Sequence, residues 1–595
     1  MTPARWPNLV ALFFSQAERF GDRPFLSAKR DGTFAPLTWT EVANQVTTLA
    51  RGLRALGVEP GDRIVLCSEN RPEWLIADLA IMTAGAVTVP AYTTNTEADH
   101  QHILDDSGAR GVILSSERLG RRLLPAVLRA TDARFVVTME PIPRQQRING
   151  EILDWGEVLV RGTAHDDDVA AMVPRLSSQD LACLIYTSGT GGTPKGVMLH
   201  HGALLHNCAG AYDALAPLGL ADEVYLSYLP LSHSYEHTAG QFFPIAIGAQ
   251  IYYAEGVETL AADMLVARPT IMTAVPRLYE SLHQRITRGV RRASPLKQRL
   301  FERALDLGRR RYHDPKSLSL GDRLLDPVLD RLVRRKVRAV FGGRLKALVS
   351  GGAALNVEIG LFFQALGLPV LQGYGQTEAG PVISVNRPGK AKIHTVGPPL
   401  KDVAVRLADD GEILVQGGLV MQGYWRNDRA TRETVRDGWL HTGDIGTFDG
   451  DGHLIITDRK KDIIVISGGD NISPVRVEGI LTLEREIAQA MVYGDRRPHL
   501  VALLVPDTDW MSAWARDADK PADLGTLAGD TAFRQALAAA VNRVNANLSA
   551  IEKVRHFTIA KEPFGIDNNQ LTPTLKIRRH AIRERYGAEL DALYH

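Results

Sequence analysis

One apolar run that leads straight into a loop rich in glycine and hydroxyl groups constrains this chain more than any other feature. The run LACLI (residues 181–185) has the length and composition of a buried strand, and YTSGTGGTPKG (residues 186–196) follows it directly. Glycines let backbone N–H groups approach a ligand closely, hydroxyl groups donate hydrogen bonds to oxygen, and Lys195 adds a positive charge. The stretch therefore predicts a phosphate-binding loop, with a flexible surface turn as the alternative. It is not a Walker A loop, because Pro194 precedes Lys195 and Gly196 follows it, so kinase-like and GTPase-like interpretations fail.

The segment before this loop alternates between helical and strand patterns. Residues 37–58 are typical of an amphipathic helix with Thr40 as its N-cap, and GDRIVLCSEN (61–70) is typical of a buried strand. A helix from about Pro72 and further strands at 86–92, 111–114 and 134–138 continue the alternation, whereas residues 144–180 are polar and poorly periodic. This rhythm predicts an α/β fold in which a large N-terminal region has mainly parallel sheets flanked by helices.

The length of 595 residues calls for at least two domains, since one hydrophobic core rarely grows so large. The pattern changes after Asp458, where DRKKD leads into a compact α+β region. We therefore predict a large domain over residues 1–458 and a small, mobile α+β domain over residues 459–595, with the hinge at 458–461.

Charge and cysteine content exclude several classes of protein. The formal net charge of +1 gives no overall attraction to nucleic acid, and three cysteines give neither a disulfide framework nor metal-ligand spacing. The N-terminus lacks the pattern of a signal peptide, and no apolar stretch reaches the roughly 20 residues of a membrane span. We expect a cytoplasmic protein that has no nucleic-acid partner, with peripheral membrane contact left open.

A local charge anomaly stands out within the near-neutral chain. Residues 285–346 hold 19 Lys/Arg and 6 Asp/Glu, a local net charge of 19 − 6 = +13, and they include a predicted basic helical insertion at about 285–341. Leu329, Leu332, Val333, Val337, Val340 and Phe341 recur at helical spacing, so at least one helix should bury a face. The insertion is either a solvated arginine-rich surface or a basic surface for anionic lipid or a CoA phosphate.

Two further strand-to-turn stretches are typical of ligand-binding edges of parallel sheets. VSGGAALN (349–356) and VLQGYGQTE (370–378) each follow an apolar segment and carry glycines that permit close backbone approach. Tyr374 offers a face on which a base can stack, and Glu378 is a hard carboxylate ligand suited to Mg²⁺.

Together with the loop at 186–196, these stretches resemble motifs of the adenylate-forming superfamily, which contains acyl-CoA synthetases, peptide-synthetase adenylation domains and luciferases. The family loop reads TSGTTGxPKG, and here Gly191 replaces the second threonine, which removes one hydroxyl donor. QGYGQTE resembles the family motif GYGxTE, and residues 411–427 and 437–446 resemble the two motifs that follow. LTPTLKIRR (571–579) resembles the motif of the mobile catalytic lysine. Six motifs in family order cover essentially the whole chain.

The resemblance implies ATP, Mg²⁺ and the co-substrate CoA, and it gives matching residues roles. Phosphates would be held by Thr187, Ser188, Gly189, Thr190 and Lys195. The adenine pocket would be lined by Gly351, Ala353, Gln372, Gly373, Tyr374 and Gly375. Thr377 would reach the α-phosphate, Thr190 and Glu378 would hold magnesium, and Asp444 and Arg459 would bind the ribose. Lys461 would be the hinge residue and Lys576 the catalytic lysine.

LPLSHSYEH (229–237) looks like the form of its motif found in long-chain fatty acyl-CoA synthetases, with His233 near the acyl carboxylate. The expected reaction is ATP-dependent formation of acyl-AMP from a fatty acid, then transfer to CoA. A fatty acyl-AMP ligase that loads a carrier protein is the alternative, and a non-catalytic lipid- or nucleotide-binding relative is a second. Chain length and oligomeric state stay open.

Overall fold

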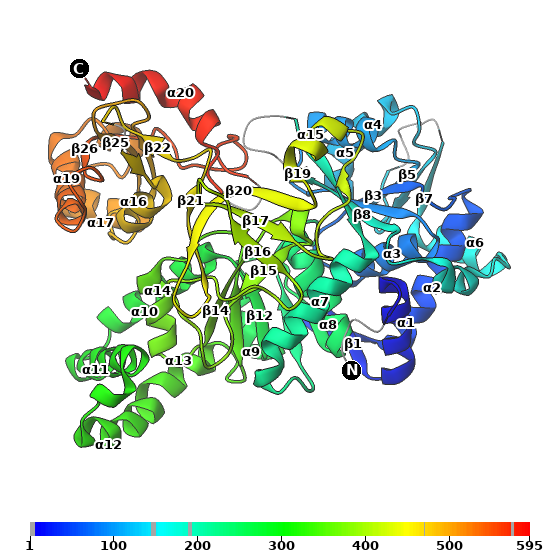
Figure 1. Ribbon diagram of the computed structural model, residues 1–595, viewed down its shortest axis with the longest axis horizontal. Helices are drawn as coiled ribbons and strands as arrows, with labels where there is room; N and C mark the ends of the chain where they lie inside the picture. Colours follow the sequence, from blue (N-terminus) through cyan, green and yellow to red (C-terminus); the bar gives the residue numbers. More distant parts are fainter. Residues whose placement is uncertain (1–5, 144–149, 188–192, 469, 573–575, 595) are drawn as a thin grey trace.

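The computed structural model describes residues 6–143, 150–187, 193–468, 470–572 and 576–594. Two eight-stranded sheets form most of the large domain, and in both the neighbouring central strands run parallel (Figure 1). The first has the order β15 (Val382–Val385), β14 (Val370–Gly375), β13 (Ala347–Ser350), β12 (Ile271–Ala274), β10 (Val224–Ser227), β11 (Gln250–Tyr253), β1 (Pro24–Arg30), β2 (Thr33–Thr38). The second has the order β18 (Gly423–Tyr424), β9 (Lys195–His200), β8 (Leu181–Thr187), β4 (Val87–Pro90), β3 (Arg63–Cys67), β5 (Gly111–Leu114), β6 (Phe135–Thr138), β7 (Glu151–Asp154).

Helices cover these sheets. Those outside the basic insertion are α1 (Leu9–Phe20), α2 (Trp39–Ala55), α3 (Pro72–Thr83), α4 (Glu97–Ser107), α5 (Glu117–Arg129), α6 (Trp155–Ala164), α7 (His201–Leu215), α8 (Phe243–Ile247), α9 (Leu260–Ala267), α14 (Val357–Ala365) and α15 (Asp428–Thr434). The basic insertion forms α10 (Pro276–Arg291), α11 (Pro295–His313), α12 (Leu320–Leu329) and α13 (Arg335–Val340). The predicted α/β architecture is thereby confirmed.

A third, smaller sheet links the two domains. It contains β16 (Ala404–Leu407), β17 (Glu412–Gln416), β20 (Trp439–Phe448), β19 (Val435–Arg436) and β21 (Leu454–Arg459). β21 is antiparallel to β20 and brings Arg459 opposite Asp444. The chain leaves the large domain at the end of β21, next to the predicted hinge residue Lys461, which is exposed. The hinge itself stays a prediction.

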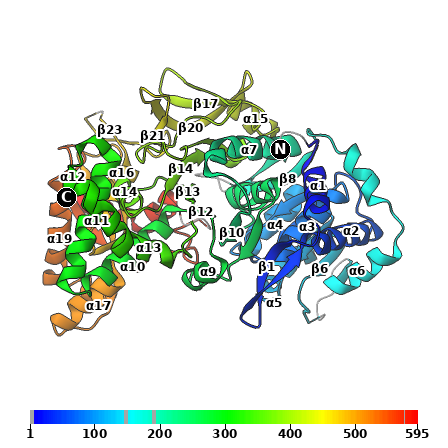
Figure 2. The ribbon, with the colours of Figure 1, turned by 90° about the horizontal axis from the view of Figure 1, so that it is seen from below.

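The small domain has apolar cores of its own. Its strands are β22 (Ile464–Val465), β23 (Asn471–Ile472), β24 (Ile487–Tyr493), β25 (Leu500–Pro506) and β26 (Val554–Ile559), and its helices are α16 (Pro474–Leu481), α17 (Thr508–Asp517), α18 (Leu524–Leu527), α19 (Thr531–Asn545) and α20 (Arg579–Asp591). The buried clusters of this region contain only residues from Ile464 onward. The domain lies against the insertion and α14, where Arg288 pairs with Asp509 at 2.6 Å and Asn356 Nδ2 donates to Gly479 O at 3.0 Å (Figure 2).

Two local expectations were wrong. The N-cap of α2 is Thr38 rather than Thr40, because Thr38 and Glu41 form a reciprocal capping box. The segment at 144–180 is not a plain excursion, since it contains β7, α6 and a 3₁₀ turn at Val169–Arg175. β7 pairs with β6 at the edge of the second sheet. This pairing stabilises a strand whose own sequence has little periodicity.

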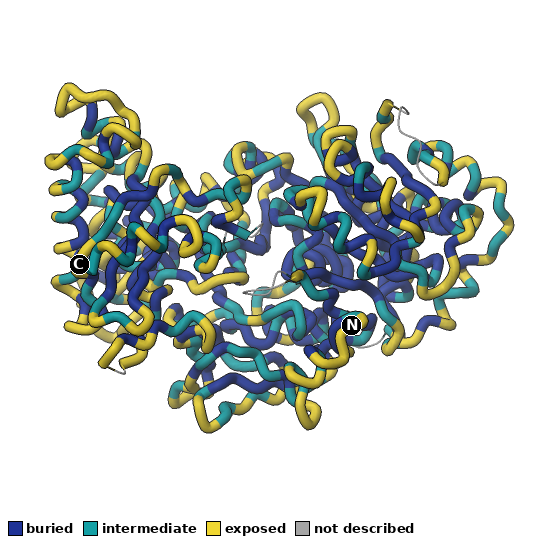
Figure 3. The backbone as a smooth tube through the Cα atoms, turned by 90° about the horizontal axis from the view of Figure 1, so that it is seen from above, coloured by how far each residue is buried: buried dark blue, intermediate teal, exposed yellow. Residues whose placement is uncertain are grey.

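Helix α3 lies at the centre of the large domain. Every residue of α3 except Glu73 is buried, and the helix contacts β1 of one sheet and β3 and β4 of the other. A helix that is apolar on all sides is stable only when enclosed in this way. Figure 3 shows buried backbone gathered in the interior of the molecule and exposed backbone along its surface.

One charged residue of α3 is buried and paired. Asp78 Oδ2 lies 2.8 Å from His237 Nε2, and both side chains are 0% exposed. His237 belongs to a π-helical segment, Glu236–Phe242, and its ring packs edge-on against Trp74 and Phe242. The pair therefore ties α3 to the segment that follows His233.

We expect Asp78→Ala to lower the free energy of unfolding by about 3 kcal/mol, because removing one partner leaves the other polar group buried and unpaired. Chemical denaturation measures this loss. Asp105→Ala, on the exposed side of α4, is the control and should cost under about 0.5 kcal/mol. The double variant Asp78→Ala/His237→Ala should cost less than the sum of the single variants; additive losses would contradict a coupled pair.

In the part of the chain that the structure describes, no helix combines the length and the apolar character needed to cross a bilayer.

Candidate active site

The predicted phosphate-binding loop lies between two paired strands. Ser188, Gly189, Thr190 and Gly191 fall outside the described residues, but both ends of the loop are described. Thr187 at the end of β8 and Lys195 at the start of β9 are register partners in an antiparallel pair. The two strands therefore fix where the loop begins and ends.

Helix α4 holds the base of this loop, which the sequence analysis missed. Tyr186 Oη donates to Asp106 Oδ2 at 2.6 Å, and Trp425 Nε1 donates to Asp106 O at 3.0 Å. His102 Nε2 lies 2.8 Å from Pro194 O on the other side of the loop. Burial, with a contribution from Asp106, raises the pKa of Tyr186, so its hydroxyl stays protonated and donates.

Tyr424 connects the loop lysine to the predicted magnesium ligand. The Lys195 ammonium lies 4.6 Å from the centre of the Tyr424 ring, a cation–π distance. Tyr424 Oη donates to Glu378 Oε1 at 2.8 Å. Tyr424 is in β18, which pairs with β9, so the sheet itself positions the ring beside Lys195. The only sequence signal for Tyr424 was its place in a stretch that resembles a family motif.

Glu378 suits a magnesium ion that also binds nucleotide phosphates. Its Oε1 is oriented by Tyr424, and its Oε2 has no hydrogen-bond partner among the described residues. Mg²⁺ usually takes one or two carboxylates, several waters and phosphate oxygens. The described residues contain no group of three or more His, Cys, Asp or Glu side chains that could enclose a metal. At this site, Glu378 is the carboxylate that could bind Mg²⁺.

Asp444 is the centre of a second cluster. Tyr374 Oη donates to Asp444 Oδ2 at 2.7 Å, and Arg459 Nε donates to Asp444 Oδ1 at 3.1 Å. The carboxylate is almost fully buried, yet each oxygen has room for a further hydrogen bond. The structure thus brings together three of the residues predicted to bind nucleoside, although β14 and the β20–β21 pair are far apart in the sequence.

The glycines of the predicted adenine pocket are required by the protein's own packing. A Cβ on Gly375 would lie 1.9 Å from Pro381 O, and a Cβ on Gly351 would lie 2.9 Å from the Tyr235 ring. A Cβ on Gly373 would lie 3.0 Å from Ser384 O. Gln372 is buried, and its Oε1 has no hydrogen-bond partner among the described residues, which fits an amino group of a base. Ala353 is exposed on the loop after β13.

His233 is neutral and oriented. Tyr235 N donates to His233 Nδ1 at 3.1 Å, which leaves the proton on Nε2. Burial and the nearby charge of Lys576 lower the pKa of His233 to about 3. The neighbouring Ser234 hydroxyl lies 3.0 Å from that of Thr377, so the His233 turn and the β14 turn are joined.

A buried polar layer lies behind His233. Glu236 accepts hydrogen bonds from Ser227 Oγ of β10 and Thr273 Oγ1 of β12, both at 2.6 Å. Gly240 leaves the space for this carboxylate, because a Cβ there would lie 2.3 Å from Glu236 Oε1. Burial raises the pKa of Glu236 to about 7. The π-helical segment is therefore anchored to two central strands of the first sheet.

Lys576 reaches this site from the small domain. Its backbone is held in a short loop, where Lys576 N donates to Thr572 Oγ1 at 3.0 Å and Thr572 N donates to Lys576 O at 2.8 Å. Burial and the charge of Arg459 lower the pKa of Lys576 to about 8, against the opposing effect of Asp444 and Glu378. The buried ammonium group is therefore coupled electrostatically to residues of both clusters described above and to His233.

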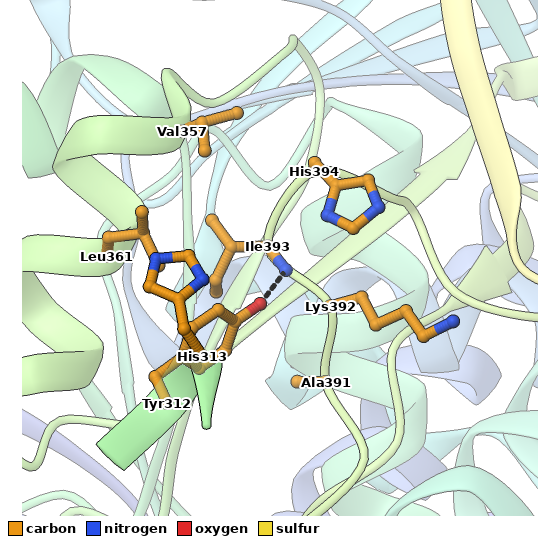
Figure 4. A pocket seen from close by; sticks show the side chains of 8 residues that line it. All are labelled: Tyr312, His313, Val357, Leu361, Ala391, Lys392, Ile393 and His394. Carbon is orange, nitrogen blue, oxygen red and sulfur yellow. Dashed lines mark hydrogen bonds between the residues drawn. The ribbon is translucent and has the colours of Figure 1, made fainter. Parts of the chain in front are cut away.

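A separate pocket of about 300 Å³ lies near the root of the basic insertion and belongs to neither cluster. Figure 4 shows the residues that line it: Tyr312, His313, Val357, Leu361, Ala391, Lys392, Ile393 and His394. Ile393 N donates to Tyr312 Oη at 2.8 Å, and Lys392 is paired with both Asp449 and Asp451. The lysine charge is therefore already neutralised, and the hydrogen bond serves to attach α11.

Residues 13–425 match the AMP-binding enzyme family, and residues 461–595 match the C-terminal domain of AMP-binding enzymes. This chain belongs to the AMP-binding enzyme family. It is 35% identical to the long-chain-fatty-acid–CoA ligase FadD15 of Mycobacterium tuberculosis, over 99% of this chain and 97% of that protein. It is 32% identical to the peroxisomal long chain acyl-CoA synthetase 7 of Arabidopsis thaliana, over 98% of this chain and 85% of that protein.

Solved structures of the family share this AMP-binding enzyme's fold. The adenylation domain of a carboxylic acid reductase from Segniliparus rugosus, in complex with AMP and a co-purified carboxylic acid, gives a TM-score of 0.78 at 21% identity and covers 99% of this chain and 94% of that one. The anthranilate CoA ligase AuaEII, in complex with anthranoyl-AMP, gives 0.73 at 20% identity and full coverage of both chains. The predicted superfamily and fold are confirmed, whereas the roles of individual site residues stay predictions.

We expect Tyr424→Phe to raise the Mg²⁺ concentration needed for half-maximal activity by about tenfold, because partners that orient a metal ligand typically contribute this much. The variant keeps the ring beside Lys195 and loses only the hydrogen bond to Glu378. A magnesium titration at saturating ATP measures the effect. Tyr312→Phe, which also removes one hydroxyl but lies outside the site, is the matched control; equal shifts in both variants would refute the assignment.

Proposed function

We propose that this AMP-binding enzyme is a long-chain fatty acid–CoA ligase that forms acyl-AMP from a fatty acid and ATP, then transfers the acyl group to CoA. The proposal is carried by two carboxylates that tyrosines orient, Glu378 by Tyr424 and Asp444 by Tyr374, and by the electrostatic coupling of both carboxylates to Lys576 of the small domain. Similarity to named long-chain ligases over essentially the whole chain supports the choice of acid and acceptor.

In the first half-reaction a carboxylate oxygen attacks the α-phosphorus of ATP, and pyrophosphate leaves. The carboxylate is already ionised, so the protein's task is to align the two groups and to stabilise negative charge. Lys576 neutralises charge between the carboxylate and the α-phosphate, and Lys195 attends the departing pyrophosphate. Neutral His233 donates through Nε2 to the acyl carboxylate, and the Asp444 cluster holds the ribose.

Glu378, with Thr190 as its predicted second ligand, would hold Mg²⁺, which would offset negative charge on the phosphate oxygens. The buried, partly unpaired Gln372 and the pair of Tyr374 with Asp444 fix the nucleoside, so the α-phosphate meets the acid in one orientation.

In the second half-reaction the thiol sulfur of CoA bonds to the acyl carbonyl carbon, AMP leaves with the bonding electrons, and the thiol gives up its proton. Lys576 has no task in this step. We propose that the small domain then turns about Lys461, which removes Lys576 and brings the surface near Ser467 to the site.

Lys576→Ala should reduce acyl-AMP formation by at least about 100-fold, because it removes the charge beside the reacting groups. Thioester formation from synthetic acyl-AMP and CoA should stay within about threefold of the unaltered enzyme. Pyrophosphate release measures the first step, and CoA-dependent AMP release measures the second. Lys553→Ala, on another surface of the small domain, is the control. Equal loss of both half-reactions would refute the role of Lys576.

The first half-reaction should weaken as the pH rises through about 8. The lowered pKa of Lys576 means that its charged form is present below this value and is lost above it. His233, with its pKa near 3, stays neutral from pH 5 to 9 and adds no inflection there. The pH profile of kcat/KM for pyrophosphate release tests this. Lys576→Arg should keep its charge and move the alkaline decline out of the range; an unchanged decline would assign it to another group.

A panel of short to very long acids, each assayed with CoA and with an acyl carrier protein, tests the proposed substrate and acceptor. CoA-dependent AMP release with long-chain acids is the expected result. Acyl-AMP that accumulates in the presence of CoA, and is consumed only with the carrier protein, would favour the fatty acyl-AMP ligase alternative.

We also propose that the enzyme works in the cytoplasm and makes peripheral contact with an anionic membrane, where a long-chain acid resides. The excess of basic residues at 285–346 and the three buried, unpaired cysteines support this placement.

A further inference from the structure

The basic insertion forms a helical lobe that extends from the body of the molecule. α11 and α12 lie at its far end in Figure 1. Arg334, which is fully buried, anchors the lobe from within: its side chain donates to Ala365 O and to Ala304 O, both at 2.9 Å, and pairs with Asp326 at 2.8 Å. The insertion is therefore a rigid, specifically folded element with an internal ionic core.

One side of α12 and of the π-helical turn that follows it, Asp330–Arg334, faces this core. Leu329 and Val333 are buried there, in the same apolar cluster as Phe301 and Leu307 of α11. The acidic residues are paired: Asp322 pairs with Arg303 and Arg310, Asp326 with Arg311 and Arg334, and Asp330 with Arg338. Every acidic side chain of α12 and this turn is thus engaged with an arginine of the lobe.

The opposite side is apolar and uncovered. Leu320 is 79% exposed, Leu324 78%, Val328 49% and Leu332 44%. These residues recur every four positions, so they form one stripe along the helix rather than scattered surface residues. Two residues of the predicted buried face, Leu332 and Val340, are exposed, and Leu332 belongs to this stripe. A contiguous exposed apolar stripe marks an interaction surface.

Basic side chains accompany the stripe. Arg323, Arg331, Arg335 and Lys336 are all exposed. Within the described ranges of the chain, none of the four has an acidic residue within ion-pairing distance. We call Leu320, Leu324, Val328 and Leu332 with these four basic residues the α12 face. Its cations are exposed and unpaired among the described residues, whereas the acids of α12 and the turn are paired with arginines, so the face is positive although the lobe is rich in ion pairs.

We propose that the α12 face is the surface by which this protein lies on an anionic lipid bilayer, with its leucine and valine side chains inserted at the level of the headgroups. A helix that presents a row of large aliphatic residues edged by arginine and lysine matches the chemistry of such an interface. This inference rests on the peripheral membrane contact proposed above and names its site.

Two other occupants fit the face less well. A second copy of the chain would set two positive surfaces against each other, because the face carries no unpaired acid to meet the arginines of its partner. A nucleic acid would engage the cations but would gain nothing from four exposed aliphatic side chains. A lipid surface satisfies both the charge and the apolar stripe.

Flotation with vesicles tests the proposal with the full-length enzyme. Vesicles with 40% phosphatidylglycerol should bind it, and pure phosphatidylcholine vesicles should bind it far less. We expect Leu324→Ser/Val328→Ser to lower the partition coefficient by about tenfold, through lost apolar burial. Arg323→Gln/Arg331→Gln should lower it by about tenfold at low salt and remove most of its salt dependence.

The control is Val160→Ser/Arg122→Gln, which alters an exposed valine of α6 and an exposed arginine of α5 at the other end of the molecule. It should bind vesicles as the unaltered enzyme does. All variants change exposed residues, so ligation of a long-chain acid supplied in detergent micelles, without vesicles, should stay normal and shows that each variant is folded. If that activity is missing in the unaltered enzyme while vesicle binding persists, the proposed function fails and the α12 face stands.

Insertion can be measured separately. The three native cysteines are buried, so an environment-sensitive fluorophore on Leu324→Cys reports only from the α12 face. Its emission should shift to shorter wavelength with anionic vesicles, and the same label on Val160→Cys should not shift. The proposal is overturned if the unaltered enzyme ignores anionic vesicles, if the α12 variants bind as well as the control, or if the Leu324 label shows only self-association of the protein.

Discussion

The ammonium group of Lys576 belongs to the small domain, but its electrostatic surroundings belong to the large one. Burial lowers the pKa of Lys576 most, Arg459 lowers it further, and Asp444 and Glu378 oppose the fall, so the pKa is about 8. Tyr424 and Tyr374 orient the two carboxylates, and the neutral state of His233 follows in part from the lysine's charge. The proposed rotation of the small domain would withdraw this charge from the site.

The large domain supplies the rigidity that such a moving part requires. The Asp78–His237 pair and the hydrogen bonds of Glu236 to Ser227 and Thr273 join α3, two strands of the first sheet and the π-helical segment behind His233. Buried polar groups are costly unless they are paired, so these contacts favour one arrangement of the segment over its alternatives. At the phosphate-binding loop, Asp106 of α4 accepts hydrogen bonds from both Tyr186 and Trp425, which lie in two different sequence motifs.

The basic lobe shows how one composition can serve two purposes. Its local charge of +13 suggested either a solvated surface or a lipid-facing one. In the folded lobe the acids of α12 pair with arginines of α11, whereas Arg323 and Arg331 are exposed on the segment that also exposes Leu324 and Val328. The net charge of the lobe therefore does not show where its positive charge is concentrated. Ion pairs neutralise many of its arginines, and the cations of the α12 face remain unpaired among the described residues.

The sequence by itself determined the superfamily, the α/β class and the identity of most candidate site residues, because motifs such as QGYGQTE and TGD are contiguous and their chemistry is local. The alternation of helix and strand patterns also predicted sheets that are mainly parallel. It did not reveal Asp106, His102 or Tyr424, because their roles arise from contacts between segments 46 to more than 300 residues apart. It also did not reveal Glu236, whose buried position is not marked by any periodicity. The sequence did not show that Leu332 is exposed and the adjacent Val333 is buried. Only tertiary structure decides which charges are paired and which apolar residues are covered, because pairing and burial depend on what the rest of the chain brings alongside.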